Sequence, residues 1–158
     1  MGLRMSKSQF DKLLNKNNSN ANNVNKKNKY RNYRITINGI NYDSKKEYDR
    51  HCILKIKEKA GEISELKFHE PSMNIILQKE PQIKYEPDFC YFEKGIYIIE
   101  DVKGYQTKEF KLKKKMIINK LNNNEITGIF RLTKCIEGTN FKIIEEYMSQ
   151  NLKEQKQS

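Results

Sequence analysis

The sequence predicts a mixed α/β fold, in an α+β arrangement where helices flank a mixed β-sheet. Apolar runs on both sides of Lys94-Gly95 predict a β-hairpin, and a helical pattern of apolar residues begins at Ser44. A second helical pattern, over residues 107–121, lies between two strand-like runs, which predicts a right-handed βαβ unit. A chain of 158 residues is long enough for one compact domain with its own core.

The two ends of the chain differ in composition from its middle. Residues 1–32 form a basic segment rich in Asn and Lys, which we expect to be disordered or weakly helical, with a short helix over residues 7–14. Residues 33–150 carry the strand and helix patterns of the domain, and residues 151–158 form a polar tail.

Within the domain, the elements are predicted in the following order. Strands 33–38 and 40–43 form a hairpin around Asn38-Gly39, and Ser44 caps a helix that ends at Gly61. Strands 66–69 and 73–78, separated by Pro71, extend the sheet. Residues 82–92 and 96–103 form the central hairpin, followed by the helix 107–121, a strand over 126–132 and a last amphipathic helix over 140–152.

The central hairpin places two acids opposite each other. With a two-residue loop at Lys94-Gly95, Asp88 falls directly across from Asp101, with their Cβ atoms roughly 5 Å apart. Strand alternation then puts Asp101 and Lys103 on the same face. A change of one residue in the loop would remove this facing arrangement.

Two carboxylates so close together repel each other, and burial raises the cost of ionising both. A hard divalent cation, Mg²⁺ or Mn²⁺, would compensate them, and Lys103 would hold or activate a water beside it. The alternative is that Asp88 and Asp101 are ordinary acids at strand ends, each paired with one of the many lysines.

Glu47 and the two histidines have two interpretations each. Ser44 and Glu47 form a capping-box pattern, so Glu47 either closes the helix start or takes part in metal or water binding. His51 lies one turn further on, where it would form a metal pair with Glu47 or be an ordinary exposed or hydrogen-bonded histidine. His69 is open to the same two interpretations.

The formal net charge of +11 favours a polyanionic partner, first of all nucleic acid. The helix 107–121 has a basic face with Lys108, Lys111 and Lys115, which we expect to contact phosphates; the alternative is a solvated helix face. The sequence has no apolar run of membrane-spanning length and does not open with a signal peptide, so we expect a cytoplasmic protein without a membrane partner.

Glu47, Pro87-Asp88 and Asp101-Val102-Lys103, in that order, resemble the PD-(D/E)XK nuclease superfamily, which includes restriction enzymes and Holliday-junction resolvases. More narrowly, the chain resembles a phage-borne nuclease-like family, domain of unknown function 1064 (DUF1064). The closer likeness rests on residues 39–47, 59–61 and 99–108.

The resemblance implies a restriction-endonuclease-like mixed sheet flanked by helices. It implies that Asp88, Asp101 and Glu47 bind Mg²⁺, or Mn²⁺ in its place, and that Lys103 positions or activates water. The implied activity is a DNA endonuclease, acting in a bacterial or phage-infected cell and often as a homodimer, with branched DNA such as Holliday junctions as one substrate class. The alternative is a non-catalytic nucleic-acid-binding or regulatory protein on the same scaffold.

Overall fold

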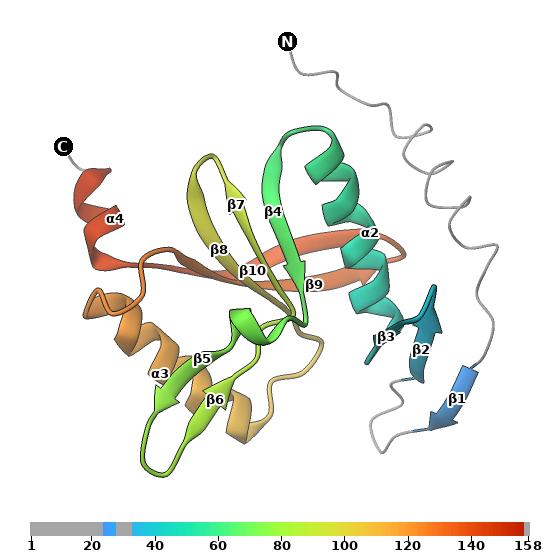
Figure 1. Ribbon diagram of the computed structural model, residues 1–158, viewed down its shortest axis with the longest axis horizontal. Coiled ribbons are helices and arrows are strands. Elements are labelled where there is room, and N and C mark those ends of the chain that lie inside the picture. Colours follow the sequence, from blue (N-terminus) through green and yellow to red (C-terminus); the bar gives the residue numbers. More distant parts are fainter. Residues whose placement is uncertain (1–23, 28–32, 157–158) are drawn as a thin grey trace.

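The computed structural model describes residues 24–27 and 33–156. A five-stranded mixed sheet forms its centre, in the order β10-β9-β8-β7-β4 (Figure 1). Strands β8 and β9 are parallel, and the other neighbours in this sheet are antiparallel. Its strands are β4 (Ile63–Phe68), β7 (Phe89–Glu93), β8 (Ile96–Val102), β9 (Ile129–Glu137) and β10 (Asn140–Met148).

Two smaller sheets and three α-helices complete the described part of the chain, so the predicted mixed α/β fold is confirmed. The first small sheet contains β1 (Val24–Lys27), β2 (Tyr33–Ile37) and β3 (Ile40–Tyr42), and the second contains β5 (Ile75–Gln78) and β6 (Ile83–Tyr85). The helices are α2 (Lys45–Lys59), α3 (Lys108–Asn122) and α4 (Gln150–Gln155), with a 3₁₀ turn at Pro71–Met73.

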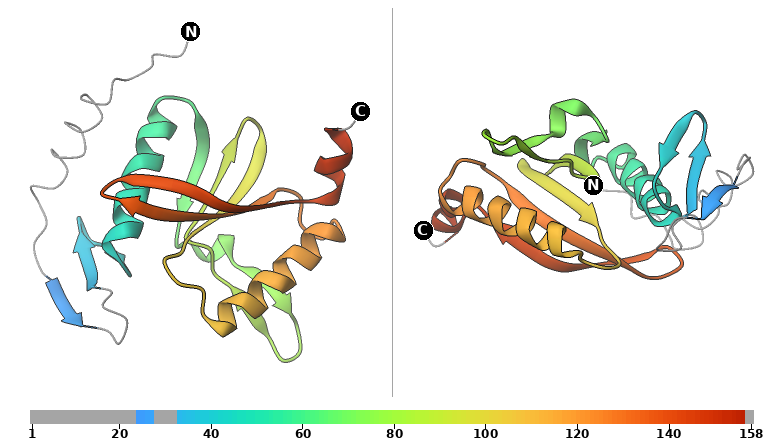
Figure 2. Two further views of the ribbon diagram at one scale, coloured as in Figure 1. Left: turned by 180° about the vertical axis from the view of Figure 1, so that it is seen from behind. Right: turned by 90° about the horizontal axis from the view of Figure 1, so that it is seen from below.

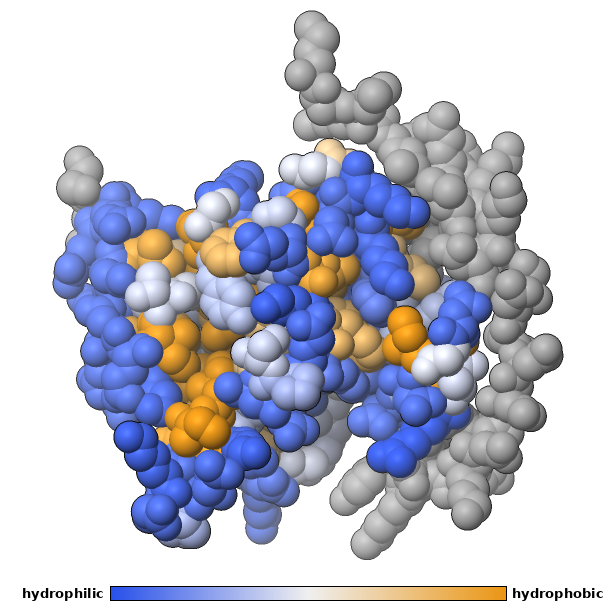
Figure 3. Space-filling model, viewed as in Figure 1, coloured by the Kyte–Doolittle hydropathy of each residue, from blue (hydrophilic) through white to orange (hydrophobic). Residues whose placement is uncertain are grey.

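The central sheet has a different cover on each face. One face packs against α3 and the β5–β6 hairpin, through a core that includes Ile99, Phe130 and Ile117. The other face packs against α2, where Leu54 contacts a core that includes Phe89 and Ile98. Figure 2 shows these layers edge-on, and Figure 3 shows apolar residues gathered over α3 and the β5–β6 hairpin on an otherwise largely hydrophilic face.

The register of the central hairpin agrees with the sequence prediction. Glu93 pairs with Ile96, and the ladder continues to Phe89 opposite Glu100. Lys94 and Gly95 both have positive φ, 52° and 76°, as a tight two-residue turn of primed type requires. One step beyond the last pair, the chain therefore brings Asp88 opposite Asp101.

Other local predictions are also confirmed. The first hairpin turns at Asn38-Gly39, where Ile37 pairs with Ile40. The Ser44 hydroxyl accepts a hydrogen bond from Glu47 N and caps α2 as predicted. Thr107, whose capping role was not predicted, caps α3 in the same way. The crossover through α3 returns the chain parallel to β8, as the βαβ pattern predicted.

The strand predicted over residues 82–92 is wrong as a single element. The chain leaves strand geometry before Pro87, which has no N–H to donate to a ladder, so β6 and β7 are separate strands. Strand β5 pairs with β6 in its own small sheet and does not extend the central one; β4 does extend it, beside β7.

The helix predicted over residues 140–152 is also wrong. Residues Asn140–Met148 form β10, which pairs with β9 after a turn at Gly138, and only the short α4 follows. The register shifts between Ile143 and Glu145. Such a bulge breaks the alternation of a strand, which explains why the apolar residues of this segment have helix-like spacing.

Much of the basic segment 1–32, including the helix expected at 7–14, lies outside the described residues. Within it, Val24–Lys27 forms β1 and pairs with β2. In the C-terminal tail, residues up to 155 belong to α4. Among the described residues, no helix is long and apolar enough to cross a membrane.

Candidate functional site

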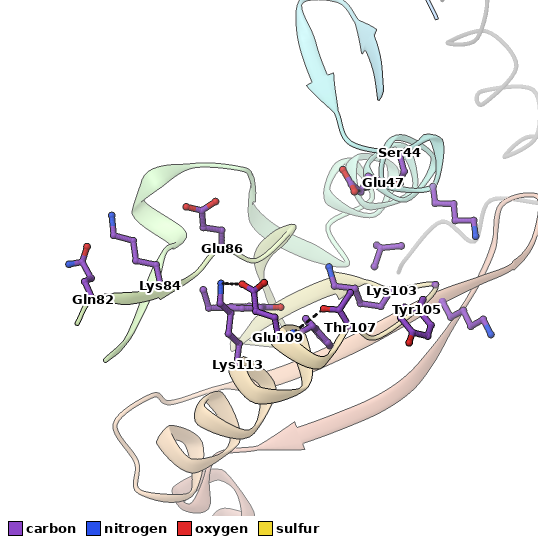
Figure 4. A pocket seen from close by; sticks show the side chains of 16 residues that line it. Ser44, Glu47, Gln82, Lys84, Glu86, Lys103, Tyr105, Thr107, Glu109 and Lys113 are labelled. Carbon is purple, nitrogen blue, oxygen red and sulfur yellow. Dashed lines mark hydrogen bonds and ion pairs between the residues drawn. The ribbon is translucent and has the colours of Figure 1, made fainter. Parts of the chain in front are cut away.

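An open cleft of about 1050 Å³ lies where four elements meet. Its walls are the start of α2, strand β6, the loop from β8 to α3, and the first turns of α3, and Lys134 of β9 also lines it (Figure 4). The lysines that line it are Lys46, Lys84, Lys103, Lys113 and Lys134, against the three glutamates Glu47, Glu86 and Glu109. The cleft is therefore suited to an anionic ligand.

Strand β8 buries two neighbouring acids on its opposite faces, Glu100 and Asp101. Glu100 is fully compensated: Arg50 forms a bidentate ion pair with it, and the hydroxyls of Tyr91 and Thr133 donate hydrogen bonds to it. This network ties α2 to the sheet. We assign Glu100 a structural role.

Asp101 has far less compensation, although its side chain is only 1% exposed. Neither of its carboxylate oxygens accepts a well-oriented hydrogen bond from a described residue. Lys103 Nζ lies 2.8 Å from Oδ2 as an ion pair. Burial and the charge of Asp88 nevertheless raise the pKa of Asp101 well above its usual value, with Lys103 opposing the rise.

Asp88, across the hairpin, is held in its charged form. Its Oδ2 accepts a hydrogen bond of 2.7 Å from the backbone N–H of Val102, and its Oδ1 lies 3.7 Å from His69 Nε2. Burial opposes ionisation of Asp88, but His69, Lys103 and the Val102 N–H together hold its pKa below the usual value. The two aspartates thus have opposite pKa shifts, the pattern of a pair that shares a proton when no cation is near.

Lys103 connects this buried pair with the cleft. Its ammonium group contacts Asp101 below, and the residue lines the cleft above. Burial favours the neutral amine, but the charges of Asp101 and Asp88 raise the pKa of Lys103 above its usual value. Asp88 and Asp101 themselves do not line the cleft surface, so Lys103 separates them from it.

Glu47 points from the first turn of α2 toward the cleft (Figure 4). It accepts hydrogen bonds from Asp43 N, at 3.0 Å, and from the Ser44 hydroxyl, so the predicted capping role is present. Burial, and then the charge of Asp88, raise the pKa of Glu47 to about 7. The cap therefore also brings a partly protonated acid close to Asp88. The capping interpretation of Glu47 is confirmed, and its role in metal or water binding stays a prediction.

The two histidines have different environments. His51 accepts or donates a 2.9 Å hydrogen bond with the Tyr42 hydroxyl and stacks on Phe68, and burial lowers its pKa to about 4. It belongs to the core, and the Glu47–His51 metal pair is not formed. His69 also stacks on Phe68, its neighbour in the sequence. Its ring faces Asp88, and this contact raises the pKa of His69.

Sequence reasoning missed Tyr85, a fifth polar group at the site. Its side chain lines the cleft, and its hydroxyl faces Asp101 without a well-oriented hydrogen bond to any described residue. Burial and the charges of Asp101 and Asp88 raise the pKa of Tyr85 well above 10. Among the described side chains, the buried polar atoms without a well-oriented hydrogen bond are this hydroxyl and the two oxygens of Asp101. All the buried polar atoms that lack such a bond therefore belong to the candidate site. No pattern in the sequence separates Tyr85 from an ordinary core tyrosine.

Lys108, Lys111 and Lys115 are exposed on α3 as predicted, but none of them lines the cleft. Lys113, on another side of the helix, does line it and forms an ion pair with Glu109. Lys46, Lys84 and Lys134 were also not singled out from the sequence. These three form no ion pair with any other described residue, so they present free charge to the cleft.

The donor atoms fit a hard divalent cation in their chemistry. Asp88, Asp101 and Glu47 are oxygen donors near one another, and Asp101 has unpartnered oxygens. However, no group of three acidic, His or Cys side chains among the described residues is arranged closely enough to hold an ion as it stands. Lys103 also lies on Oδ2 of Asp101, so it would have to move for that oxygen to bind a cation.

The comparisons with known proteins add one finding. A family model described as "Protein of unknown function (DUF1064)" matches residues 27–137, which is more than half of the chain. The searches of curated proteins and of solved structures found no significant match.

We predict that Asp101→Asn makes the metal-free protein more stable at pH 8. The raised pKa means that the folded state binds this proton more tightly than the unfolded state, so stability is lost as the pH rises from about 4 toward the folded-state pKa. Removing the charge should raise the Tm in EDTA by roughly 2 to 6 °C, about 1 to 2 kcal/mol.

The gain should shrink as the pH falls toward 4, and thermal unfolding followed by circular dichroism measures it. Glu109→Gln is the matched control, because Glu109 is exposed; its Tm should stay within about 2 °C of the wild type. An Asp101→Asn variant less stable than the wild type at pH 8 would contradict the inference that the buried charge of Asp101 destabilises the folded protein.

Proposed function

Since the chain belongs to the DUF1064 family of proteins of unknown function, its activity has to be inferred from its own residues, and we propose that it is a metal-dependent DNA endonuclease of the PD-(D/E)XK type. The observation that carries the proposal is Asp101, buried and undercompensated opposite the ionised Asp88, with Lys103 between it and a lysine-lined cleft. Acids that only supported the fold would be expected to resemble Glu100, with every oxygen paired.

In the proposed reaction, Asp88, Asp101 and Glu47 hold Mg²⁺, or Mn²⁺ in its place. When bound, the cation supplies charge stabilisation at the phosphate and a water of lowered pKa. Asp88 is already ionised and oriented by the Val102 N–H. Lys103, released from Asp101, reaches the cleft with a charged ammonium group that orients the attacking water or the phosphate. By resemblance to the superfamily, the products carry 5′-phosphate and 3′-hydroxyl ends.

The unpaired lysines support DNA as the substrate. Lys46, Lys84 and Lys134 lie on different walls of the cleft, where they would neutralise phosphates along a strand. Lys108, Lys111 and Lys115 would extend the basic surface along α3. We further propose a homodimer, which would allow two strands to be cut, acting in the cytoplasm of a bacterial or phage-infected cell.

We predict that Asp88→Ala, Asp101→Asn and Lys103→Ala each lower the rate of DNA cleavage with Mg²⁺ by at least about 100-fold. DNA binding should remain and keep its steep dependence on salt, because the cleft lysines supply it. Single-turnover cleavage of a labelled panel of linear, nicked, flapped and four-way DNA measures the rate and identifies the substrate, and a matched RNA tests the sugar preference. Wild-type cleavage by all three purified variants would rule out the proposed site.

A second function is favoured by one observation. The aspartates do not line the cleft, and no three ligands are arranged around an ion within the described part of the chain. A non-catalytic DNA-binding protein on the same scaffold would have these features. It would bind DNA through the lysines, show no cleavage of any DNA in the panel and require no divalent cation.

Glu47→Gln separates the capping role of Glu47 from a role in the reaction. A glutamine side chain still offers an oxygen to Asp43 N, so we predict a Tm within about 2 °C of the wild type. If Glu47 acts through its charge, the cleavage rate falls by about 10-fold or more, and more Mg²⁺ is needed for half-maximal rate. Unchanged cleavage together with unchanged stability would leave Glu47 as a helix cap alone.

A further inference from the structure

We propose that Tyr105 is a stacking platform for an unpaired nucleobase beside the scissile phosphate, so that the cleft selects DNA with an unpaired nucleotide over continuous duplex. This inference rests on the proposed function for its substrate. It assigns the choice of DNA structure to one residue in the loop between β8 and α3.

The first observation is the exposure of Tyr105. Its side chain is 76% exposed, which is more than any other exposed large apolar side chain in the described part of the chain. No other described aromatic ring lies against it. An exposed, unstacked tyrosine is therefore available to a ligand.

The second observation is its place. Tyr105 lines the cleft and follows Lys103 by two residues, so their Cα atoms lie within about 7 Å of each other. Figure 4 shows Tyr105 on the far side of Lys103 from the wall that carries Gln82, Lys84 and Glu86. A strand that passes Lys103 along the cleft would thus have Tyr105 as its next aromatic contact.

The third observation is the charge around the ring. Lys46 Nζ would lie 3.8 Å from a β-carbon built at Gly104. The ammonium group of Lys46, which forms no ion pair with a described residue, therefore lies close to the residue that precedes Tyr105. Lys134 lines the same cleft and also has no ion pair with a described residue. Aromatic rings among free lysines are the combination that binds single-stranded nucleic acid, in which the ring stacks on a base and the cations hold the backbone.

Duplex geometry turns this contact into selectivity. In continuous B-form DNA each base is stacked between its neighbours, so a ring in the cleft meets only backbone and base edges. At a flap, gap or branch, an unpaired base turns out at low cost and its π-face becomes accessible. Tyr105 would therefore add binding energy only where the DNA has an unpaired nucleotide.

The test measures binding in EDTA, so that no DNA is cut, with the full chain and two DNAs of equal length. One is a flapped duplex with 2-aminopurine as the first unpaired base, and the other is a continuous duplex with 2-aminopurine at the same position. We expect the wild type to prefer the flapped DNA and to quench its fluorescence. Tyr105→Ala should weaken flapped-DNA binding by about 5- to 150-fold, abolish the quenching and leave duplex binding within about twofold.

Tyr105→Phe keeps the ring and should keep both the preference and the quenching. Leu112→Ala is the matched control, since Leu112 is 58% exposed on α3 and does not line the cleft; it should behave as the wild type. Unchanged flapped-DNA binding by Tyr105→Ala, or equal weakening on both DNAs, would overturn the inference. If the wild type cleaves with Mg²⁺ but shows no quenching on the flapped DNA, this inference alone is overturned. If the wild type shows the quenching but cleaves no DNA, the proposed nuclease activity alone is overturned.

Discussion

The structure is constrained above all by the two-residue turn at Lys94-Gly95. Its positive φ values fix the register of β7 against β8, and this register brings Asp88 opposite Asp101 at the far end of the hairpin. With β8 between two neighbouring strands and core clusters on both faces, Asp101 has no route to solvent, and its charge depends on what approaches from the cleft. Lys103 is the group that approaches it in this structure, and it compensates Asp101 only in part.

Glu100 shows what full compensation looks like one residue away. It is buried on the opposite face of β8, yet Arg50, Tyr91 and Thr133 satisfy its oxygens and fasten α2 to the sheet. Strand β8 therefore carries one buried acid whose oxygens are all hydrogen-bonded and a neighbouring acid whose oxygens are not. The lack of hydrogen bonds at Asp101 is a local feature of the sheet face that is turned toward the cleft. Natural proteins accept such strain mainly where a ligand relieves it.

Much of the fold and part of the site follow from local sequence rules. The turns at Asn38-Gly39 and Lys94-Gly95, the cap at Ser44 and the parallel crossover are set by nearby residues, and all were predicted. The β10 strand was missed because a bulge gives its residues helical spacing. The partners of Glu100, the approach of His69 to Asp88 and the hydroxyl of Tyr85 depend on contacts between distant segments, which no local pattern encodes.

The proposed nuclease activity requires a divalent cation to replace Lys103 as the charge partner of Asp101. Isothermal titration calorimetry of Mn²⁺ and Mg²⁺, without DNA and with a cleft-binding DNA, tests this in the wild type and in Asp101→Asn, with Glu109→Gln as the control. We predict that the wild type and Glu109→Gln bind the cation and that Asp101→Asn binds it at least about 10-fold more weakly. Equal cation binding by the wild type and Asp101→Asn, or no binding by the wild type even with DNA, would contradict it.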